Sequence, residues 1–420
     1  MTAGGILTLN AGSSSLKFAV YDATPDLPLK LSGQISGLNG LPRMRASTES
    51  VVLADEPWAG PADLDAVLER LFDWLAAQRQ ADGVIAVGHR IVHGGLEFRE
   101  PRTMDEDVLA KLEDLSSLAP LHQPFNLRGV RMAMRRVPNT LQVGVFDTAF
   151  HADQPEAARL YGLPRDLIDE GVLAYGFHGL SYDYIASVLR QRDGKRAGGR
   201  AIVLHLGSGV SLCAMNQGRS VATTMGFSAL DGPPMSTRSG SIDPGVILYL
   251  LQAKGMSPAA VSDLLYQRSG LLGLSGLSGD MVALLASQAA HARQALEVYV
   301  YRIAREIGSL AAALGGLDTL VFTAGVGENA PAIRERIVAF SGWLGATLDH
   351  EANLAGAGRI DSGGGVEILV VPTDEQLVIA RGVYERLGSR GEREEAFSST
   401  GEPAAGRPSP WRAGRPAAPR

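Results

Sequence analysis

Ile-Leu-Thr-Leu-Asn-Ala-Gly-Ser-Ser-Ser-Leu-Lys, at residues 6–17, is an apolar strand that runs into a turn of small residues. The same design returns at 202–212 as Ile-Val-Leu-His-Leu-Gly-Ser-Gly-Val-Ser-Leu, and Asn10 falls on His205 when the two are superposed. Each turn lacks side-chain bulk where a phosphate could approach backbone N–H groups. Two copies, one in each half of the chain, predict a duplicated fold that holds one phosphate chain from both sides.

The composition is that of an ordinary globular chain. Its 420 residues are too many for one ordinary core, so we expect two domains. Hydrophobic residues make up 45% and charged residues 20%, which is typical of globular proteins. The formal net charge of −6 argues against nucleic acid or an anionic membrane as the main partner.

The single cysteine and the apolar runs bear on the compartment. Cys213 has no second cysteine to pair with, which favours a reducing compartment, and its apolar strand pattern indicates a small core residue. Residues 1–20 show no basic segment followed by a long apolar core, so no signal peptide is expected. No uncharged apolar run approaches the roughly 20 residues that span a bilayer. These patterns predict a cytoplasmic protein.

Strands alternating with helices predict α/β layers. Strand-like runs lie at 6–9, 17–21, 84–88, 141–146, 201–206, 210–215, 319–323 and 367–371. Helical patterns lie at 62–79, 105–117, 181–192, 243–254, 281–313, 330–340 and 375–388. We expect 281–313 to be one long helix, buried or at an interface, and Gly388 to end the last helix.

The predicted domains follow from these runs. We expect an N-terminal domain of residues 1–148 plus 376–388 and a C-terminal nucleotide-binding domain of residues 149–375. Residues 389–420 are rich in Pro, Ser, Gly, Glu and Arg and cannot bury much apolar surface, so they are expected to be a disordered tail.

Several polar residues stand where strands end in turns or loops. Arg90 lies between an apolar strand and a glycine turn, and Arg238 lies in a loop of small residues, settings that suit a guanidinium aimed at an anion. Asp147 ends a strand, where a carboxylate in an α/β sheet commonly faces the ligand crevice. His122 lies between two prolines and His178 between two glycines, residues typical of loops rather than of regular helix or strand faces.

Two further strand ends carry signals for phosphate and metal. Residues 323–331 read as a strand, a glycine turn and a helix start. Residues 370–376 end a strand in two acids, Asp374 and Glu375, of which one is expected to cap a helix and the other to lie on the side of a magnesium ion. Neither a Walker loop nor a Rossmann fingerprint is present.

Taken together, these segments resemble the acetokinase family of the actin and sugar-kinase superfamily. The resemblance covers about residues 5–387 and keeps the family's order. Its most specific parts are Leu-Asn-Ala-Gly-Ser-Ser-Ser-Leu-Lys (9–17), Gly-His-Arg-Ile-Val-His-Gly-Gly (88–95), Phe-Asp-Thr-Ala-Phe-His (146–151), Tyr-Gly-Phe-His-Gly (175–179), Thr-Arg-Ser-Gly (237–240) and Val-Phe-Thr-Ala-Gly-Val-Gly-Glu-Asn (321–329).

The resemblance implies a fold and a reaction. The fold would be two duplicated ribonuclease-H-like, or actin-like ATPase, domains with a cleft between them. The reaction would be reversible transfer of the γ-phosphoryl of ATP to acetate, giving acetyl phosphate and ADP, with Mg²⁺ or with Mn²⁺ in its place. The family also implies a homodimer. Because acetate is already an anion at neutral pH and needs no general base, we expect direct in-line transfer.

The resemblance also implies residue roles. Arg90 and Arg238 would hold the carboxylate and the transferring phosphoryl, Asp147 would be the essential acid, His178 a transition-state donor and His122 a further active-site histidine. The metal would lie nearest Asn10 and Glu375. The nucleotide-binding positions are Lys17, His205, Gly207, Ser208, Gly209, Asp280, Gly325, Val326, Gly327 and Asn329, and the acyl pocket consists of Arg90, Val92, Leu121, Phe177 and Ala229.

Four positions depart from the family pattern. Ser208 stands where Asn is usual, Ser241 where Asp is usual, Val282 where Arg is common, and Ala229 where Pro is usual in the acyl pocket. The smaller Ala229 leaves a propionate or butyrate kinase open as an alternative. A non-catalytic actin-like ATP-binding protein is a second alternative, although the two arginines argue against it.

Overall fold

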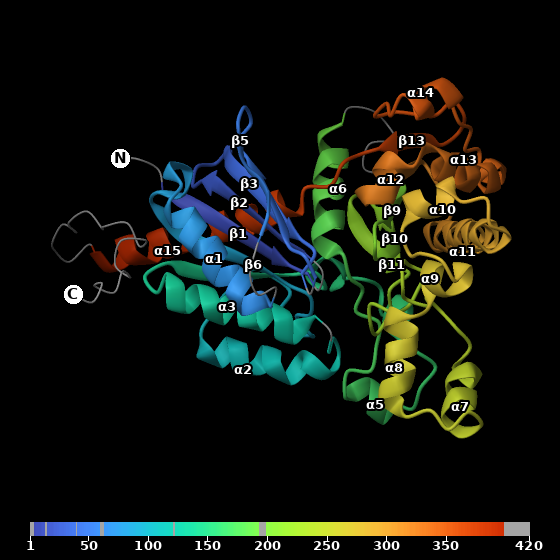
Figure 1. The fold of residues 1–420 in the computed structure, drawn as a ribbon, viewed down its shortest axis with the longest axis horizontal. Coiled ribbons are helices and arrows are strands. Elements are labelled where there is room, and N and C mark those ends of the chain that lie inside the picture. Colours follow the sequence, from blue (N-terminus) through green and yellow to red (C-terminus); the bar gives the residue numbers. More distant parts are fainter. Residues whose placement is uncertain are drawn as a thin grey trace. The chain divides into compact units, whose positions relative to one another are not determined.

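The chain divides into two compact units, each described here by itself (Figure 1). The structure is a computed structural model that describes residues 4–12, 15–38, 40–58, 63–120, 122–192 and 199–398, with side chains described as far as Gly388. Unit 1 is Met1–Ala149 with Asp374–Arg420, and unit 2 is Phe150–Thr373. Leu121 and the 399–420 part of the predicted tail lie outside the described residues.

Unit 1 is built on one mixed sheet of order β5-β4-β3-β2-β1-β6-β8-β7. The strands are β1 (Gly5–Ala11), β2 (Ser15–Asp22), β3 (Leu29–Ser36), β4 (Arg43–Ser47), β5 (Val52–Pro57), β6 (Val84–Ile91), β7 (Arg102–Thr103) and β8 (Leu141–Phe146). The helices are α1 (Leu64–Ala76), α2 (Glu106–Asp114), α3 (Gln123–Arg136) and α15 (Glu375–Ser398).

Unit 2 is built on a second mixed sheet of order β11-β10-β9-β12-β13. Its strands are β9 (Arg200–Leu206), β10 (Val210–Asn216), β11 (Arg219–Thr223), β12 (Thr319–Thr323) and β13 (Glu367–Val370). Its helices are α4 (Glu156–Arg159), α5 (Arg165–Asp169), α6 (Gly179–Gln191), α7 (Pro244–Gln252), α8 (Pro258–Gln267), α9 (Gly270–Ser275), α10 (Met281–Ala286), α11 (Ala290–Leu314), α12 (Ala324–Asn329), α13 (Pro331–Phe340) and α14 (His350–Leu354).

The two sheets repeat one pattern. In unit 1, β3, β2 and β1 run antiparallel in sequence, and β1, β6 and β8 then run parallel. In unit 2, β11, β10 and β9 run antiparallel, and β9, β12 and β13 run parallel. The duplication predicted from the paired turns is therefore visible in the strand order and direction of both units.

Apolar faces explain why each sheet is covered by helices. In unit 1, residues of α1 and α3 such as Leu71 and Met132 pack on one face, and Ala380 and Val383 of α15 pack on the other. In unit 2, Ile185 of α6 lies in the core of one face, while α11 contacts β9, β10 and β11 (Figure 1). Parallel strands buried on both faces are typical of such layered α/β folds.

Every strand-like run expected from the sequence is a strand, but several elements were not expected. The exposed β4 and β5, with Arg, Asp and Glu on them, carry little apolar signal, and neither β3 nor α3 was predicted. Cys213 is fully buried, and burial raises the pKa of its thiol to about 12, so it is a core residue as predicted.

Three expectations about helices were wrong. The stretch 281–313 is two helices, because the Ser287 hydroxyl accepts the Ala289 N–H and the chain is extended between α10 and α11. The last helix continues past Gly388 to Ser398, since one glycine in a helix costs only about 1 kcal/mol. The predicted tail is therefore helical over its first ten residues.

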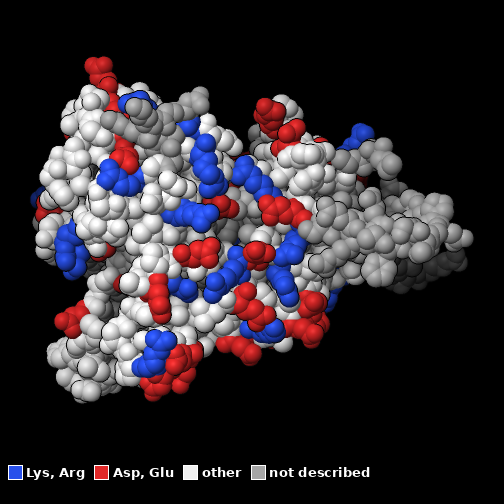
Figure 2. All heavy atoms as spheres, turned by 180° about the vertical axis from the view of Figure 1, so that it is seen from behind, with Lys and Arg blue, Asp and Glu red and all other residues white. Residues whose placement is uncertain are grey.

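On the face drawn in Figure 2, basic and acidic side chains of the described residues are intermixed. This is what a composition of 39 basic and 45 acidic residues predicts. Among the described residues, no helix is both long enough and apolar enough to cross a membrane.

Candidate active site

In unit 1, the predicted polar residues gather where the parallel strands end. Asn10 is the penultimate residue of β1, Arg90 is the penultimate residue of β6, and Asp147 directly follows β8. Glu375 begins α15. Because β1, β6 and β8 are parallel neighbours, their carboxyl ends share one edge of the sheet, which is where α/β folds bind ligands.

Hydrogen bonds join these four side chains into one network. The Arg90 Nε donates to Asp147 at 3.1 Å, and its Nη2 donates to Asp147 Oδ2 at 2.5 Å. The Arg90 Nη1 donates to Asn10 Oδ1 at 3.1 Å, and Asn10 Nδ2 donates to Glu375 Oε2 at 2.7 Å. Arg90 is thus held from two sides, and Asp147 orients it through both carboxylate oxygens.

The network is charged and largely out of water. The side chain of Asp147 is 1% exposed and that of Arg90 is 17% exposed. Burial lowers the pKa of Arg90, but the charges of Asp147 and Glu375 more than offset this, so the pKa lies above its ordinary value. Arg90 therefore stays a cation at the end of the sheet.

Of the two acids after β13, one caps a helix as predicted. The Asp374 carboxylate accepts the Leu377 N–H at 2.9 Å and so caps the start of α15. Glu375 is left to bond Asn10.

A second set of side chains supports this edge and was not predicted from the sequence. Asn126 of α3 accepts the Val92 N–H at 3.0 Å and donates to the Ala11 carbonyl at 2.9 Å. Gln123 bonds both the N–H and the carbonyl of His93. The buried amide of Asn126 thus joins the ends of β1 and β6. This contact could not be predicted from the sequence because the helix that carries it, α3, was not predicted.

In unit 2, two histidines stack beside the second glycine turn. The rings of His178 and His205 lie 4.2 Å apart with an interplanar angle of 20°. The Nδ1 of His178 bonds Ser211 at 2.8 Å, and the Nδ1 of His205 bonds Ser181 at 2.8 Å. His178 has a left-handed backbone, with φ 57°, which a non-glycine residue rarely adopts and which is typical of functional sites.

The two rings lie against this turn, most tightly at Gly209. A Cβ on Gly209 would lie 3.1 Å from Nε2 of His178 and 3.7 Å from Nη1 of Arg238. A Cβ on Gly207 would lie 3.5 Å from Nε2 of His205. The structure therefore brings His178, His205 and Arg238 together around the turn at 207–209.

The loop that carries Arg238 is tied to the same turn. Arg238 Nη1 donates to the Ala229 carbonyl at 3.0 Å, so Ala229 lies against the arginine. The Ser236 N–H donates to the carbonyl of Ser208 at 3.2 Å. Ser241, at the position where the family usually has Asp, instead donates to the Asp231 carboxylate and accepts the Gly232 N–H.

The segment 325–329, predicted to be a glycine turn that binds nucleotide, is helical. Gly325, Val326, Gly327 and Asn329 lie in α12, which begins at Ala324 with φ +64°, directly after β12. The left-handed Ala324 reverses the chain so that the helix can start at once, which makes a glycine turn unnecessary. The buried Arg334 donates to the carbonyl of Gly327 at 3.0 Å and holds the end of this helix.

The remaining predicted residues are distributed over both units. Lys17 is exposed on β2, and His122 is half-buried at the start of α3. Asp280 is exposed and caps α10, where it accepts the Ala283 N–H. Val92 is buried in unit 1 and Phe177 in unit 2. The exposed Val282 follows Asp280 on α10.

The donors near Asn10 and Glu375 suit a hard divalent cation. Among the described residues, no group of three or more His, Cys, Asp or Glu side chains could hold a metal ion. Mg²⁺ commonly keeps several waters and takes only one or two carboxylates, with substrate phosphates completing its shell. A carboxylate and an amide oxygen fit that pattern.

Comparison with known proteins places the chain in a family. Residues 5–381 match the model of the acetokinase family. An acetate kinase of Rhodopseudomonas palustris (strain TIE-1) is 48% identical over 394 residues, covering 92% of this chain and 99% of the relative. An acetate kinase of Rhizobium meliloti is 48% identical over 381 residues, covering 90% and 96%.

Solved structures agree. A propionate kinase from Francisella tularensis superposes with a TM-score of 0.82 at 34% identity, covering 90% of this chain and 98% of that chain. An acetate kinase from Porphyromonas gingivalis gives 0.78 at 34% identity, covering 92% and 100%. The duplicated sheets and their edge sites thus define an enzyme of the actin-like ATPase fold. Within that class, the chain belongs to the acetokinase family. The family implies ATP as a substrate and a divalent metal ion.

Proposed function

We propose that this chain is an acetate kinase, which transfers the γ-phosphoryl of ATP directly to acetate and gives acetyl phosphate and ADP. The observation that carries the proposal is Arg90, a cation held between Asp147 and Asn10 at the ligand edge of unit 1. The relatives at 40–48% identity that bear the name acetate kinase support the same reaction. A protein that only bound nucleotide would not need such an oriented arginine.

The two arginines would lower the barrier between two anions. Acetate is a nucleophile at neutral pH, so the protein needs no general base and contributes alignment and charge neutralisation. Arg90 cannot turn away, because Asp147 fixes its planar fork. Arg238 donates to the Ala229 carbonyl beside the turn at 207–209, and its charge would bond an incoming oxyanion.

Asn10 and Glu375 would hold Mg²⁺, or Mn²⁺ in its place. When bound, the cation neutralises charge on the phosphate oxygens. The Glu375 carboxylate would ligate it directly or through water, and Asn10 would keep that carboxylate in place through its 2.7 Å hydrogen bond.

The turn at 207–209 would receive the phosphates of the nucleotide. The turn has no side-chain bulk at Gly207 and Gly209, and the two imidazoles border it. The nucleotide role of α12, Lys17 and Asp280, the acyl-pocket role of Val92, Leu121, Phe177 and Ala229, and the active-site role of His122 are carried by the family resemblance.

The experiment is a coupled assay of ADP release with ATP and a divalent cation, run without acid and with acetate, propionate or butyrate. We expect release that depends on the acid and is fastest with acetate. ADP release that is independent of any carboxylic acid would contradict the proposal. Preference for propionate would favour the alternative that the small Ala229 leaves open, because Ala229 lies against Arg238.

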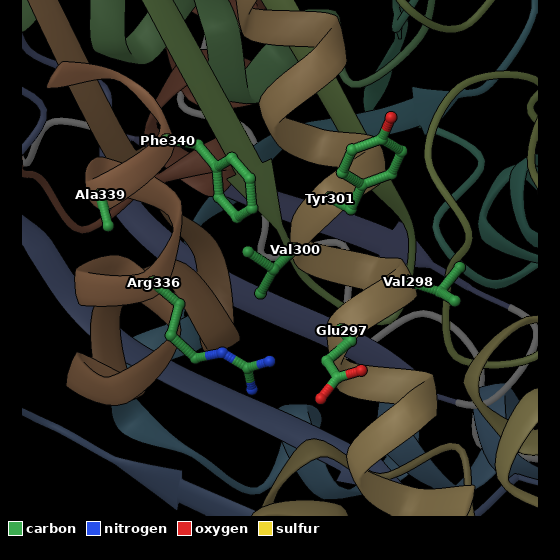
Figure 3. Close-up of a pocket in the computed structure, with 7 residues that line it drawn as sticks. All are labelled: Glu297, Val298, Val300, Tyr301, Arg336, Ala339 and Phe340. Carbon is green, nitrogen blue, oxygen red and sulfur yellow. The ribbon is translucent and has the colours of Figure 1, made fainter.

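We also propose that two copies associate through unit 2. Tyr301 of α11 and Phe340 of α13 line a hollow of about 570 Å³ and are each half exposed (Figure 3). Glu297 and Arg336 lie on the same hollow with opposite charges, so a two-fold partner could pair each with its opposite. On α7, a nine-residue apolar helix, none of the residues is buried.

Sedimentation at micromolar concentration tests the association. We expect a dimer for the native chain and a monomer for Tyr301→Glu or for Leu248→Glu, and the variant that dissociates identifies the face used. A native monomer would contradict the proposal. The cytoplasm remains a prediction that rests on the single cysteine.

A further inference from the structure

A hydrogen-bonded chain runs behind His178. The Tyr182 hydroxyl lies 2.5 Å from Ser211 Oγ, which lies 2.8 Å from His178 Nδ1. Tyr182 and Ser211 are both 0% exposed. Tyr182 belongs to α6 and Ser211 to β10, so the chain links a helix and a strand on either side of the imidazole.

The direction of the protons in this chain follows from counting donors. Burial holds the pKa of Tyr182 well above its usual value, so its phenol keeps the proton. Among the described residues, Ser211 Oγ is the one partner of the Tyr182 hydroxyl, and a buried donor without an acceptor is costly. The phenol therefore donates to Ser211.

The Ser211 hydroxyl can donate one hydrogen bond of its own. Since its oxygen accepts from Tyr182, its own hydrogen points to the remaining partner, His178 Nδ1. A ring nitrogen that accepts carries no proton, so the neutral imidazole carries its proton on Nε2.

We propose that Tyr182 and Ser211 are positioning residues that keep the ring proton of His178 on Nε2, the nitrogen beside the turn at 207–209. A Cβ on Gly209 would lie 3.1 Å from that nitrogen and 3.7 Å from Nη1 of Arg238. With the opposite tautomer, a lone pair rather than an N–H would face an oxyanion in the turn. The inference rests on the proposed function, because it gives the N–H a phosphoryl oxygen to bond.

His205 repeats the arrangement. Its Nδ1 bonds the buried Ser181, its Nε2 lies nearest Gly207, and its ring is nearly parallel to that of His178. The left-handed backbone of His178 starts α6, which places Ser181 and Tyr182 three and four residues on, behind the two rings. Strain at His178 thus serves to set both rings against one turn.

The first arm of the test reads the tautomer without any turnover. Long-range ¹H–¹⁵N spectra of the native protein, with the His178 signals assigned by their loss in His178→Gln, report which nitrogen is protonated. We expect Nε2–H for His178 in the native chain and a mixture of tautomers in Ser211→Ala. Nδ1–H in the native chain would overturn the proposal. Because this reading needs no catalysis, it stands even if the proposed reaction is not found.

The second arm is kinetic. We expect Ser211→Ala to lower kcat about tenfold or more while KM for ATP changes less than about twofold, as for other outer-sphere partners of reactive histidines. Tyr182→Phe should have a smaller effect, since Ser211 could still donate, and Ser211→Thr should restore most of the rate. Tyr299→Phe is the matched control, because the Tyr299 hydroxyl is buried without a partner among the described residues. Equal kcat in Ser211→Ala and the native enzyme would overturn the proposal.

Discussion

The ligand edges of the two units use the same strands for different chemistry. In unit 1, Asn10 is the penultimate residue of β1 and bonds Arg90 on the neighbouring β6. In unit 2, the matching residue is His205 on β9, which pairs with Thr323 of β12. Arg90 in unit 1 forms a salt bridge with Asp147. The residue at the matching position in unit 2 is Thr323, whose hydroxyl is buried without a partner among the described residues.

This difference shows how a duplicated fold can divide one reaction. Unit 1 holds fixed charge: a cation, two carboxylates and an amide that joins them. Unit 2 presents the imidazoles of His178 and His205 together with Arg238 around the turn at 207–209, groups that can donate to phosphate oxygens. In our account, the charged edge serves the carboxylate and the metal, and the second edge serves the nucleotide.

The largest expected effect is that of Arg90→Ala. It removes the proposed carboxylate-binding cation and leaves Asp147 buried without its charge partner. We expect kcat/KM for acetate to fall by about 10³-fold or more, and the free energy of unfolding to fall by about 3 kcal/mol. Steady-state kinetics and urea unfolding measure the two. An Arg90→Ala enzyme of native rate would remove unit 1 from the mechanism.

Arg238→Ala is the matched change in unit 2. We expect a similar loss of turnover, about 10³-fold, because an arginine on a transferring phosphoryl contributes on that scale. Stability should fall less than in Arg90→Ala, where removal of the arginine leaves the buried Asp147 carboxylate without its salt bridge. ATP binding, followed by calorimetry, should persist. Equal destabilisation by both arginine variants would contradict the division between the two edges.

Much of this contrast was visible in the sequence, because the polar residues stand at strand ends. Asn10, Arg90 and Asp147 each follow an apolar strand, and parallel strands bring such positions to one edge. The supporting side chains were not visible. Asn126 bonds the carbonyl of Ala11, 115 residues away, and Arg334 of α13 bonds a carbonyl of the preceding helix α12, so no local pattern marks them. The exposed strands β4 and β5 lack the apolar alternation by which strands are predicted.

The hydrogen-bonded chain from Tyr182 through Ser211 to His178 could not be predicted from the local sequence either. Ser211 stands in the quoted turn sequence, but its partner Tyr182 is 29 residues away on another element. The same holds for the left-handed Ala324, which turned an expected glycine turn into the start of α12. Such backbone conformations depend on tertiary packing rather than on the residue itself.

Acid should destabilise the fold through histidines that are buried in both units. Burial lowers the pKa of His89 and His93 in unit 1, and of His151 in unit 2, to about 4. The unfolded histidines bind protons below about pH 6.5 while the folded ones do not, so this stability is present above pH 6.5 and is lost as pH falls toward 4.

The urea midpoint at pH 7, 6 and 5 measures this loss. His93→Asn keeps an acceptor for the Gly95 N–H, which His93 Nδ1 now accepts at 3.0 Å, and should make the decline with acid shallower. The exposed His291→Asn is the control and should follow the native chain. If His93→Asn and His291→Asn decline alike, burial of His93 is not a source of the acid sensitivity.

The smallest expected effect is on acyl selectivity. Ala229→Pro restores the usual family residue beside Arg238 and fills the space that a longer acid would need. We expect the ratio of kcat/KM for acetate over propionate to rise by about tenfold, since one methylene in an apolar pocket is worth about 1–3 kcal/mol. An unchanged ratio would show that Ala229 does not set the acyl chain length.

The most direct test of the account is the path of the phosphoryl group. Native enzyme is mixed with ATP labelled at the γ-phosphate and a divalent cation, with and without acetate, and quenched in acid within one turnover. The account predicts label passing from ATP to acetyl phosphate, with none retained on the protein when acetate is absent. A phosphorylated residue that forms and decays as fast as turnover would contradict direct transfer between the two substrates.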